Sequence, residues 1–195
     1  MQVPLSSIAT VQSGVVLSRK ETNSDLDAIK YQRLSLRALN SSGQVDHFEL
    51  EVFLSRDPIQ MTHRTTPGDI VIRLFSPLFP TLITEDDTGF VIPSQLAVVR
   101  LQSDAPMLPA YLQYCLSRQA VAEAFSTAES GSQRSITVKM ISNLNIPIVP
   151  IGVQKNITHI VELSSQRAQL YQQLIEQEKI HSENVIEAMI RGELQ

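Results

Sequence analysis

The sequence has one cysteine, no tryptophan and no long apolar run. With Cys115 alone, an internal disulfide and a thiolate metal cluster within one chain are both excluded. Cys115 lies in the apolar stretch PAYLQYCLSRQAVAEAF, where a small buried side chain is far more common than a nucleophile. No apolar run is long enough to span a bilayer, and the N-terminus lacks a basic segment followed by an apolar one. We therefore expect a cytoplasmic protein.

Sequence signatures of catalysis are also missing. The Asn/Asp-Pro-Pro-aromatic step and glycine-rich loop of an N6-adenine methyltransferase do not occur, and no lysine has an acid two positions before it, as one nuclease class requires. There is no G-x-S-x-G elbow and no P-loop. The four histidines, His47, His63, His159 and His181, show no metal-ligand spacing. We predict no metal site, no cofactor and no enzyme, although an active site built from scattered residues would be invisible at this level.

The charge balance is weakly acidic. The chain has 16 basic and 20 acidic side chains, a net charge of −4, which argues against a protein that coats nucleic acid non-specifically. Any nucleic-acid surface must therefore be a local patch. Two windows supply basic side chains for one: Arg19, Lys20, Lys30, Arg33 and Arg37, then Arg56, His63, Arg64 and Arg73. Each of these residues is equally consistent with ordinary solvated charge.

The last quarter of the chain, from about Val153 to Arg191, has the pattern of one long amphipathic helix. Apolar or small residues recur at alternating steps of four and three, the period of a coiled-coil seam. Gly192 stands where a C-cap glycine belongs. Such a helix is about 58 Å long, so we expect a partner helix rather than packing along its own domain. The apolar seam positions are Ile157, Val161, Ala168, Tyr171, Ile175, Val185 and Met189, and Ser164, Glu178 and Ser182 complete the repeat.

Residues 1–150 have the pattern of an α+β domain with antiparallel or mixed β structure and one packing helix. Alternating or β-branched runs bounded by turn residues predict the strands. Pro109 begins the predicted helix, which runs to about Phe125, and IPIVP closes the domain. We predict a domain over 1–150 and a helical arm over 151–195. The predicted strands lie within Val3–Val16, Ile29–Leu39, Val45–Phe53, Gly68–Pro77, Thr81–Thr84 and Phe90–Leu101.

Five motifs occur in a characteristic order. They are a strand that opens with Gly-Asp (GDIVIRL), the strand SQLAVVRL, the helix YLQYCLSRQAV, the loop GSQRSI, and the step LNIPIVPIGVQ before the long helix. Over essentially the whole chain, this order resembles one half of the DNA-specificity subunit of type I restriction-modification systems. The chain departs from the family pattern at 150–154, where Pro-Leu-x-Glu-Gln is common, and at 75–78, where many members carry a glycine.

The resemblance implies a function for each part. Subunits of this family usually have two target-recognition domains, each followed by a long helix, and the two helices pair as an antiparallel spacer. For this chain it implies a non-catalytic subunit that binds double-stranded DNA through 1–150. The arm would pair with a second copy, as a homodimer that reads a bipartite site, and with methyltransferase subunits, and a restriction subunit can join.

Arg, Lys and Gln side chains are suited to phosphates and base edges, and they give the candidate DNA contacts. Gln133 and Arg134 share the GSQRSI loop, which can equally be a turn that caps the next helix. The candidates are Arg19, Lys20, Arg33, Arg37, Arg64, Arg73, Gln133 and Arg134.

A competing hypothesis is a protein-interaction module that uses its helix for oligomerisation and binds no DNA. The negative net charge and the 5% aromatic content favour it. A hydrolase without a recognisable motif ranks below both hypotheses.

Overall fold

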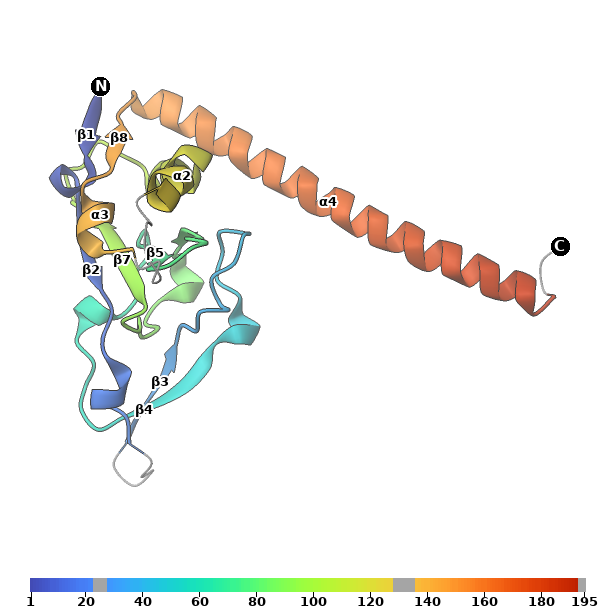
Figure 1. The fold of residues 1–195 in the computed structure, drawn as a ribbon, viewed down its shortest axis with the longest axis horizontal. Coiled ribbons are helices and arrows are strands. Elements are labelled where there is room, and N and C mark those ends of the chain that lie inside the picture. The colour runs from blue at the N-terminus through green and yellow to red at the C-terminus, as the bar shows by residue number, and fades with distance from the viewer. Residues whose placement is uncertain (23–27, 128–135, 193–195) are drawn as a thin grey trace. The chain divides into compact units, whose positions relative to one another are not determined.

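The computed structural model describes residues 1–22, 28–127 and 136–192, and the chain divides into two compact units, Met1–Lys155 and Asn156–Gln195. The first unit is α+β and the second is helical, which confirms the predicted fold class (Figure 1). The strands are β1 (Gln2–Pro4), β2 (Ala9–Ser13), β3 (Ile29–Arg33), β4 (Glu51–Ser55), β5 (Ile70–Arg73), β6 (Thr81–Leu82), β7 (Leu96–Leu101) and β8 (Asn145–Pro147). The α-helices are α1 (Pro109–Ser117), α2 (Gln119–Thr127), α3 (Val138–Ser142) and α4 (Ile151–Ile190).

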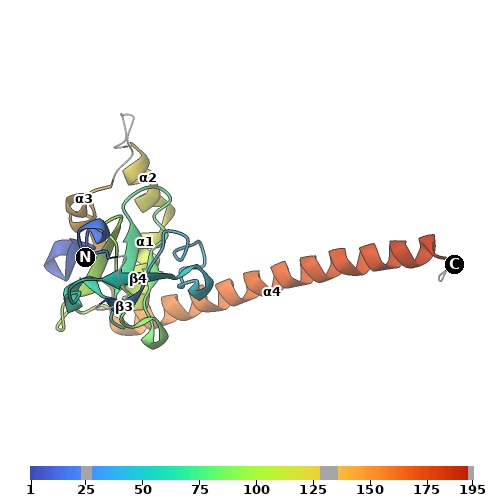
Figure 2. The ribbon, with the colours of Figure 1, turned by 90° about the horizontal axis from the view of Figure 1, so that it is seen from below.

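All pairings between these strands are antiparallel. A four-stranded sheet has the order β2-β7-β5-β6, while β1 pairs with β8 and β3 pairs with β4 as separate two-stranded ribbons. The β3–β4 ribbon lies at the opposite end of the first unit from β1 and β8 (Figure 1), and Figure 2 views the unit from the ribbon's side. Short 3-10 turns connect the strands: η1 (Leu5–Ser7), η2 (Leu17–Arg19), η3 (His47–Glu49), η4 (Met61–His63) and η5 (Glu85–Asp87).

All six predicted strands are shorter in the structure, and four of them end or are interrupted for identifiable local reasons. The run Val3–Val16 contains β1 and β2 separated by η1, and it ends at Gly14, where a Cβ would lie 2.1 Å from the carbonyl oxygen of Ile92. Only glycine fits so close to another backbone. The run Ile29–Leu39 ends as a strand at Arg33, because the hydroxyl of Ser35 accepts the N–H groups of Arg37 and Ala38 and forms a turn instead.

The other two interruptions also have local causes. In the run Val45–Phe53, the Asp46 carboxylate accepts the N–H of Phe48 at 3.1 Å, which caps η3 and delays β4 to Glu51. In the run Phe90–Leu101, β7 begins only at Leu96, after a turn in which the Leu96 N–H donates to the Pro93 carbonyl. Local side-chain and proline geometry therefore overrides the alternating pattern at these points.

The helix predicted from Pro109 to Phe125 is two helices, which corrects the sequence prediction. Arg118 separates them with an extended backbone, φ −64° and ψ 142°. A continuous helix would direct Ala120 inward after Leu116. The break instead buries Phe125 on α2, while Ala120 is exposed.

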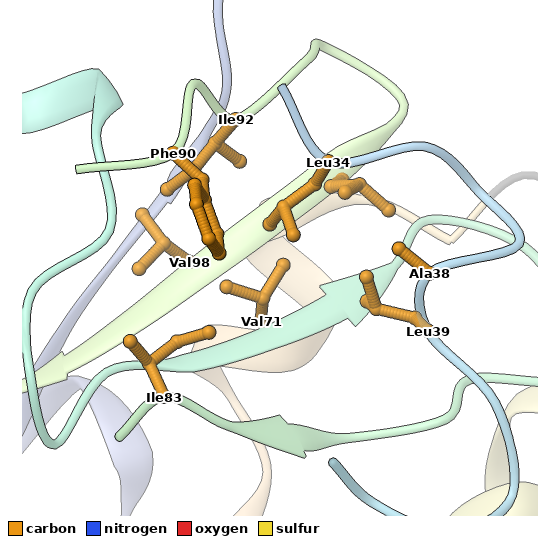
Figure 3. Close-up of a cluster of buried hydrophobic side chains, with 9 residues drawn as sticks. Leu34, Ala38, Leu39, Val71, Ile83, Phe90, Ile92 and Val98 are labelled. Atoms are coloured by element: carbon orange, nitrogen blue, oxygen red, sulfur yellow. The ribbon is translucent and has the colours of Figure 1, made fainter. Parts of the chain in front are cut away.

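Two hydrophobic clusters hold the strands and loops together. The larger one joins the sheet to the loop after β3 (Figure 3) and contains Leu34, Ala38, Leu39, Val71, Ile83, Phe90, Ile92, Leu96 and Val98. The smaller one is built on Phe53, Ile59 and Val91, with Tyr31 packed against it. Because Tyr31 and Phe53 face each other across the β3–β4 register, this cluster buries one face of the ribbon and leaves the other outside.

The long C-terminal helix is confirmed. α4 has 40 residues and begins at Ile151, two residues earlier than predicted. Gly192 ends it with φ 73°, and its N–H donates to the Met189 carbonyl at 3.1 Å, as expected of a C-cap glycine. In the described parts of the chain no helix is both long and apolar enough to cross a membrane.

Candidate nucleic-acid interface

The β3–β4 ribbon gathers basic residues from three segments. The N–H of Thr22 donates to the Leu54 carbonyl at 3.1 Å, and the N–H of Arg56 donates to the Lys20 carbonyl at 2.9 Å. These bonds place Lys20 and η2, which ends at Arg19, along the outer edge of β4. Lys30 stands opposite Leu54 in the β3–β4 register. The ribbon therefore brings Arg19, Lys20 and Lys30 close to Arg56, which is distant from them in the sequence.

Two of these cations are available at the surface. Arg19 is exposed, and within the described residues its side chain has no bonding partner. The Lys20 ammonium lies 3.1 Å from the Asp57 carboxylate, and the two side chains are 36% and 64% exposed. Such a pair contributes at most about 1 kcal/mol, so a phosphate could replace Asp57 at little cost.

Arg33 and Arg64 lie on either side of Val91, which forms a β-bridge with each of them. The Arg33 guanidinium pairs with Glu51, and the Arg64 guanidinium contacts the Met61 sulfur and lies 5.9 Å from the centroid of the Tyr31 ring. The Nε atoms of both arginines are buried without a hydrogen-bond partner among the described residues. Unmet donors of this kind are uncommon in folded proteins, and two of them stand here beside the ribbon.

Arg73 is used inside the domain. Its Nη2 donates to the carbonyl of Leu39 at 2.6 Å and also to that of Leu36, and its guanidinium lies 4.7 Å from the Phe79 ring centroid. Burial lowers the pKa of Arg73 from its ordinary value. These contacts hold the loop after β3 against the sheet, so Arg73 stabilises the domain.

The remaining predicted contacts are separate from this group. Arg37 is exposed in the Ser35 turn, and its side chain has no partner in the described structure. Gln133 and Arg134 fall outside the described residues. The structure thus brings together Arg19 and Lys20, and separately Arg33 and Arg64.

The predicted seam of α4 is open to solvent. Tyr171 is 59% and Ile175 is 61% exposed, Val161, Ala168 and Met189 are also exposed, and Ile157 and Val185 are half-buried. A second apolar stripe, not predicted from the sequence, consists of Ile160, Leu163, Leu170 and Leu174, each at least 50% exposed. At 3.6 residues per turn this stripe is rotated from the seam by about a quarter turn. The sequence could have shown this stripe, because most of its residues stand one position before a residue of the seam.

Two buried polar side chains, Gln154 and Asp69, hold neighbouring segments of the domain in place and were not predicted from the sequence. Gln154 is fully buried: its Oε1 accepts the Leu108 N–H at 2.8 Å, and its Nε2 donates to the carbonyls of Pro106 and Val149. Asp69, the acid of the Gly-Asp motif, is buried against Arg100 with bonds of 2.6 and 2.7 Å. Both residues lie in motifs of the resemblance, but their partners are distant in sequence and give no local signal.

No family model and no curated protein matches this sequence. Among solved structures, the HsdS subunit from Thermoanaerobacter tengcongensis superposes with a TM-score of 0.73 at 15% identity, over 95% of this chain and 47% of that one. The chain has the HsdS fold. A chain from a structure concerned with complex assembly and conformational transition of the type I R-M system superposes with a TM-score of 0.66 at 14% identity, over 95% and 43%.

The S subunit of a type I restriction-modification system from M. genitalium has the HsdS fold as well. It superposes with a TM-score of 0.54 at 12% identity, over 94% of this chain and 44% of that one. The present chain therefore spans less than half the length of each of these three chains. The resemblance to one half of such a subunit is confirmed at the level of fold.

Proposed function

We propose that this chain is a DNA-specificity subunit of a type I restriction-modification complex, cytoplasmic and non-catalytic. Residues 1–150 read one half of a bipartite DNA site, and residues 151–195 pair with partner helices. The subunit directs methyltransferase subunits, and a restriction subunit where one is present, to that site. The observation that carries this proposal is the superposition of 95% of the chain on half of an HsdS subunit.

The exposed seam of α4 supports a homodimer. A coiled-coil seam that is exposed in one copy is stabilised when it buries its apolar side chains against an identical seam. The two copies would then present two identical readers to a DNA site with two-fold symmetry, and the helix would set the distance between the half-sites.

The second stripe supports a further partner. A dimer through the seam would still leave Ile160, Leu163, Leu170 and Leu174 on an adjacent side of α4. Exposed apolar stripes of this length are typical of interaction surfaces. We assign this stripe to the methyltransferase subunit.

The decisive experiment is a pull-down from native lysate with the full-length chain, followed by mass spectrometry and light scattering. We expect a DNA methyltransferase together with two copies of the chain. Binding of this assembly to duplex DNA should weaken steeply as salt increases, because phosphate contacts release counterions. A chain that recovers no methyltransferase and binds no duplex, alone or with an added methyltransferase, would contradict the proposal.

One feature favours the alternative of a protein-interaction module. Phe48 in η3 is 100% exposed, and it lies next to Glu49 and two residues after Asp46. An exposed aromatic ring among carboxylates suits a basic protein surface better than a phosphate backbone. If Phe48→Ala abolished recovery of every partner while DNA binding was absent in both forms, the interaction module would be the better description.

A further inference from the structure

The outer face of the β3–β4 ribbon carries a set of side chains that neither the core nor the candidate contacts account for. In the register, Gln32 stands opposite Val52 and Lys30 stands opposite Leu54. Directly opposed residues of an antiparallel pair lie on the same face. Since Tyr31 and Phe53 point into the smaller cluster, these four side chains point away from it.

These side chains are available for a ligand. Val52 is 61% exposed, and Lys30 and Gln32 are exposed too. In the described structure neither the Gln32 amide nor the Lys30 ammonium has a hydrogen-bond partner or an ion-pair partner. The outer face therefore offers a cation and a free amide on β3 and an exposed aliphatic side chain opposite the amide on β4.

The ribbon is braced on both edges, so its outer face is held in one place. On the edge of β3 that faces away from β4, the Val91 N–H donates to the Gln32 carbonyl at 2.9 Å, and the Leu34 N–H donates to the Val91 carbonyl at 3.0 Å. On the free edge of β4, the N–H groups of Thr22 and Arg56 make the two bonds described above. A ligand therefore meets a pre-ordered surface and has little ordering cost to overcome.

The charge around the ribbon differs from that of the whole chain. Over 17–33 and 51–57 the sequence has five cations, Arg19, Lys20, Lys30, Arg33 and Arg56, and five acids, Glu21, Asp25, Asp27, Glu51 and Asp57, so this part is neutral where the whole chain has a charge of −4. Two of the acids are paired with Arg33 and Lys20. Exposed cations such as Lys30 and Arg56 beside an amide and an aliphatic group are suited to DNA, whose phosphates border base edges.

The dimensions agree with this ligand. Five residues of a strand extend about 17 Å, and neighbouring strands lie about 5 Å apart. A two-stranded ribbon of this width fits the major groove of B-DNA, which is about 12 Å wide. The minor groove, at about 6 Å, is too narrow for it.

We propose that the β3–β4 ribbon enters the major groove and that Gln32 and Val52 read an A·T base pair. The Gln32 amide donates to adenine N7 and accepts from adenine N6, while Val52 contacts the thymine methyl group. Opposed Cβ atoms lie about 5 Å apart, so the two side chains can reach one pair. Lys30, two residues along β3, reaches an adjacent guanine or a phosphate. This inference rests on the proposed function and adds the groove and the reading residues to it.

The first test selects binding sites from a random duplex pool with the full-length chain and with Gln32→Ala. We expect the wild type to recover a motif, and Gln32→Ala to lose its preference for A·T at one position of each half-site by about tenfold, with the rest of the motif unchanged. Gln44→Ala, which removes another exposed glutamine outside the ribbon, is the matched control and should recover the wild-type motif. Thermal midpoints equal to the wild type confirm that each variant is folded.

The second test removes single DNA atoms at the position so identified. Replacing adenine by 7-deazaadenine removes N7, and replacing thymine by uracil removes the methyl group. The wild type should lose about tenfold in affinity with the first change, Gln32→Ala should be insensitive to it, and Val52→Ala should be insensitive to the second.

The outcomes distinguish failure of the ribbon assignment from failure of the proposed function. If the wild type selects a motif and Gln32→Ala selects the same one, the ribbon does not read the site and the proposed function stands. If deazaadenine and uracil weaken the variants as much as the wild type, the contact is not made in the major groove by these residues. If the wild type selects no motif, alone or with an added methyltransferase, the proposed function fails and this inference fails with it.

Discussion

Arg100 binds Asp69 with two nitrogens, Nε to Oδ1 at 2.7 Å and Nη2 to Oδ2 at 2.6 Å, and the same Nη2 donates to the carbonyl of Arg64 at 3.1 Å. Asp69 is 1% exposed and also accepts the N–H and hydroxyl of Thr66. Bonding to Asp69 raises the pKa of Arg100 above its ordinary value. An ion pair between the buried Asp69 and the half-buried Arg100 therefore holds the main chain of the loop that presents Arg64.

Breaking this pair should destabilise the domain. Arg100→Met leaves the Asp69 carboxylate buried without its cation, and we expect a loss of about 3 kcal/mol in the free energy of unfolding. Lys20→Met, which breaks the exposed pair with Asp57, should cost less than about 1 kcal/mol. Urea unfolding measures both. Equal losses for the two variants would mean that the Arg100 pair is no more important than a surface contact.

Arg64 and Arg73 should respond differently to substitution. We expect Arg64→Ala to reduce the slope of log affinity against log salt by about one with little change in stability, as for a phosphate contact. Arg73→Lys should instead lower the stability by about 1 to 2 kcal/mol, because lysine cannot bond both loop carbonyls as the guanidinium does. DNA-binding titrations at several salt concentrations and thermal unfolding distinguish the two roles. A reduced slope with unchanged stability for Arg73→Lys would contradict this division.

Charges placed in the α4 seam should separate the copies. Val161→Glu and Tyr171→Glu each place a charge in the apolar seam, where it would be buried on pairing, and we expect monomers by light scattering. Gln173→Glu adds the same charge on the opposite side of the helix and should stay dimeric. A Tyr171→Glu variant with the wild-type mass would show that the dimer does not use this seam.

Gln154 should be required for docking of the first turn of α4 onto the domain. Gln154→Ala leaves the Leu108 N–H and two carbonyls without their partner, and we expect a loss of about 2 to 3 kcal/mol. Val153→Ala, at the neighbouring exposed position, serves as the control and should change stability little. The measurement is the free energy of unfolding in urea, and a Gln154→Ala protein as stable as the control would contradict the role.

Tyr111 should make the domain sensitive to alkali. Burial raises the pKa of Tyr111 to about 12, and its hydroxyl donates to the Pro147 carbonyl at 3.2 Å. An acid whose pKa is raised by folding stabilises the fold below its unfolded pKa of about 10, and this stabilisation is lost as the pH rises toward 12. Tyr111→Phe should remove this decline. Unfolding experiments between pH 9 and 12 compare the slopes, and identical slopes would show that another group is responsible.

Features that depend on a local pattern of residues could be predicted from the amino-acid sequence. The apolar period and the terminal glycine predict α4 and its end at Gly192, and the order of short β runs predicts an α+β domain. Element boundaries were less accurate where a single side chain or a proline sets the turn, as at Ser35, Asp46 and Pro93. The break at Arg118 depends on which face of α2 meets the core, and the helical period alone does not show it.

Which polar side chains are bonded within the domain, and which stay free at its surface, depends on the tertiary fold. Arg73 and Arg64 look alike in sequence, but Arg73 bonds a loop carbonyl 34 residues away, whereas Arg64 lies beside Arg33 across Val91. Gln32 and Val52 become neighbours only through the β3–β4 register, and Gln154 finds its partner 46 residues upstream. Contacts so distant along the chain have no local periodicity, because packing of the whole domain, and not the conformation of one segment, brings them together.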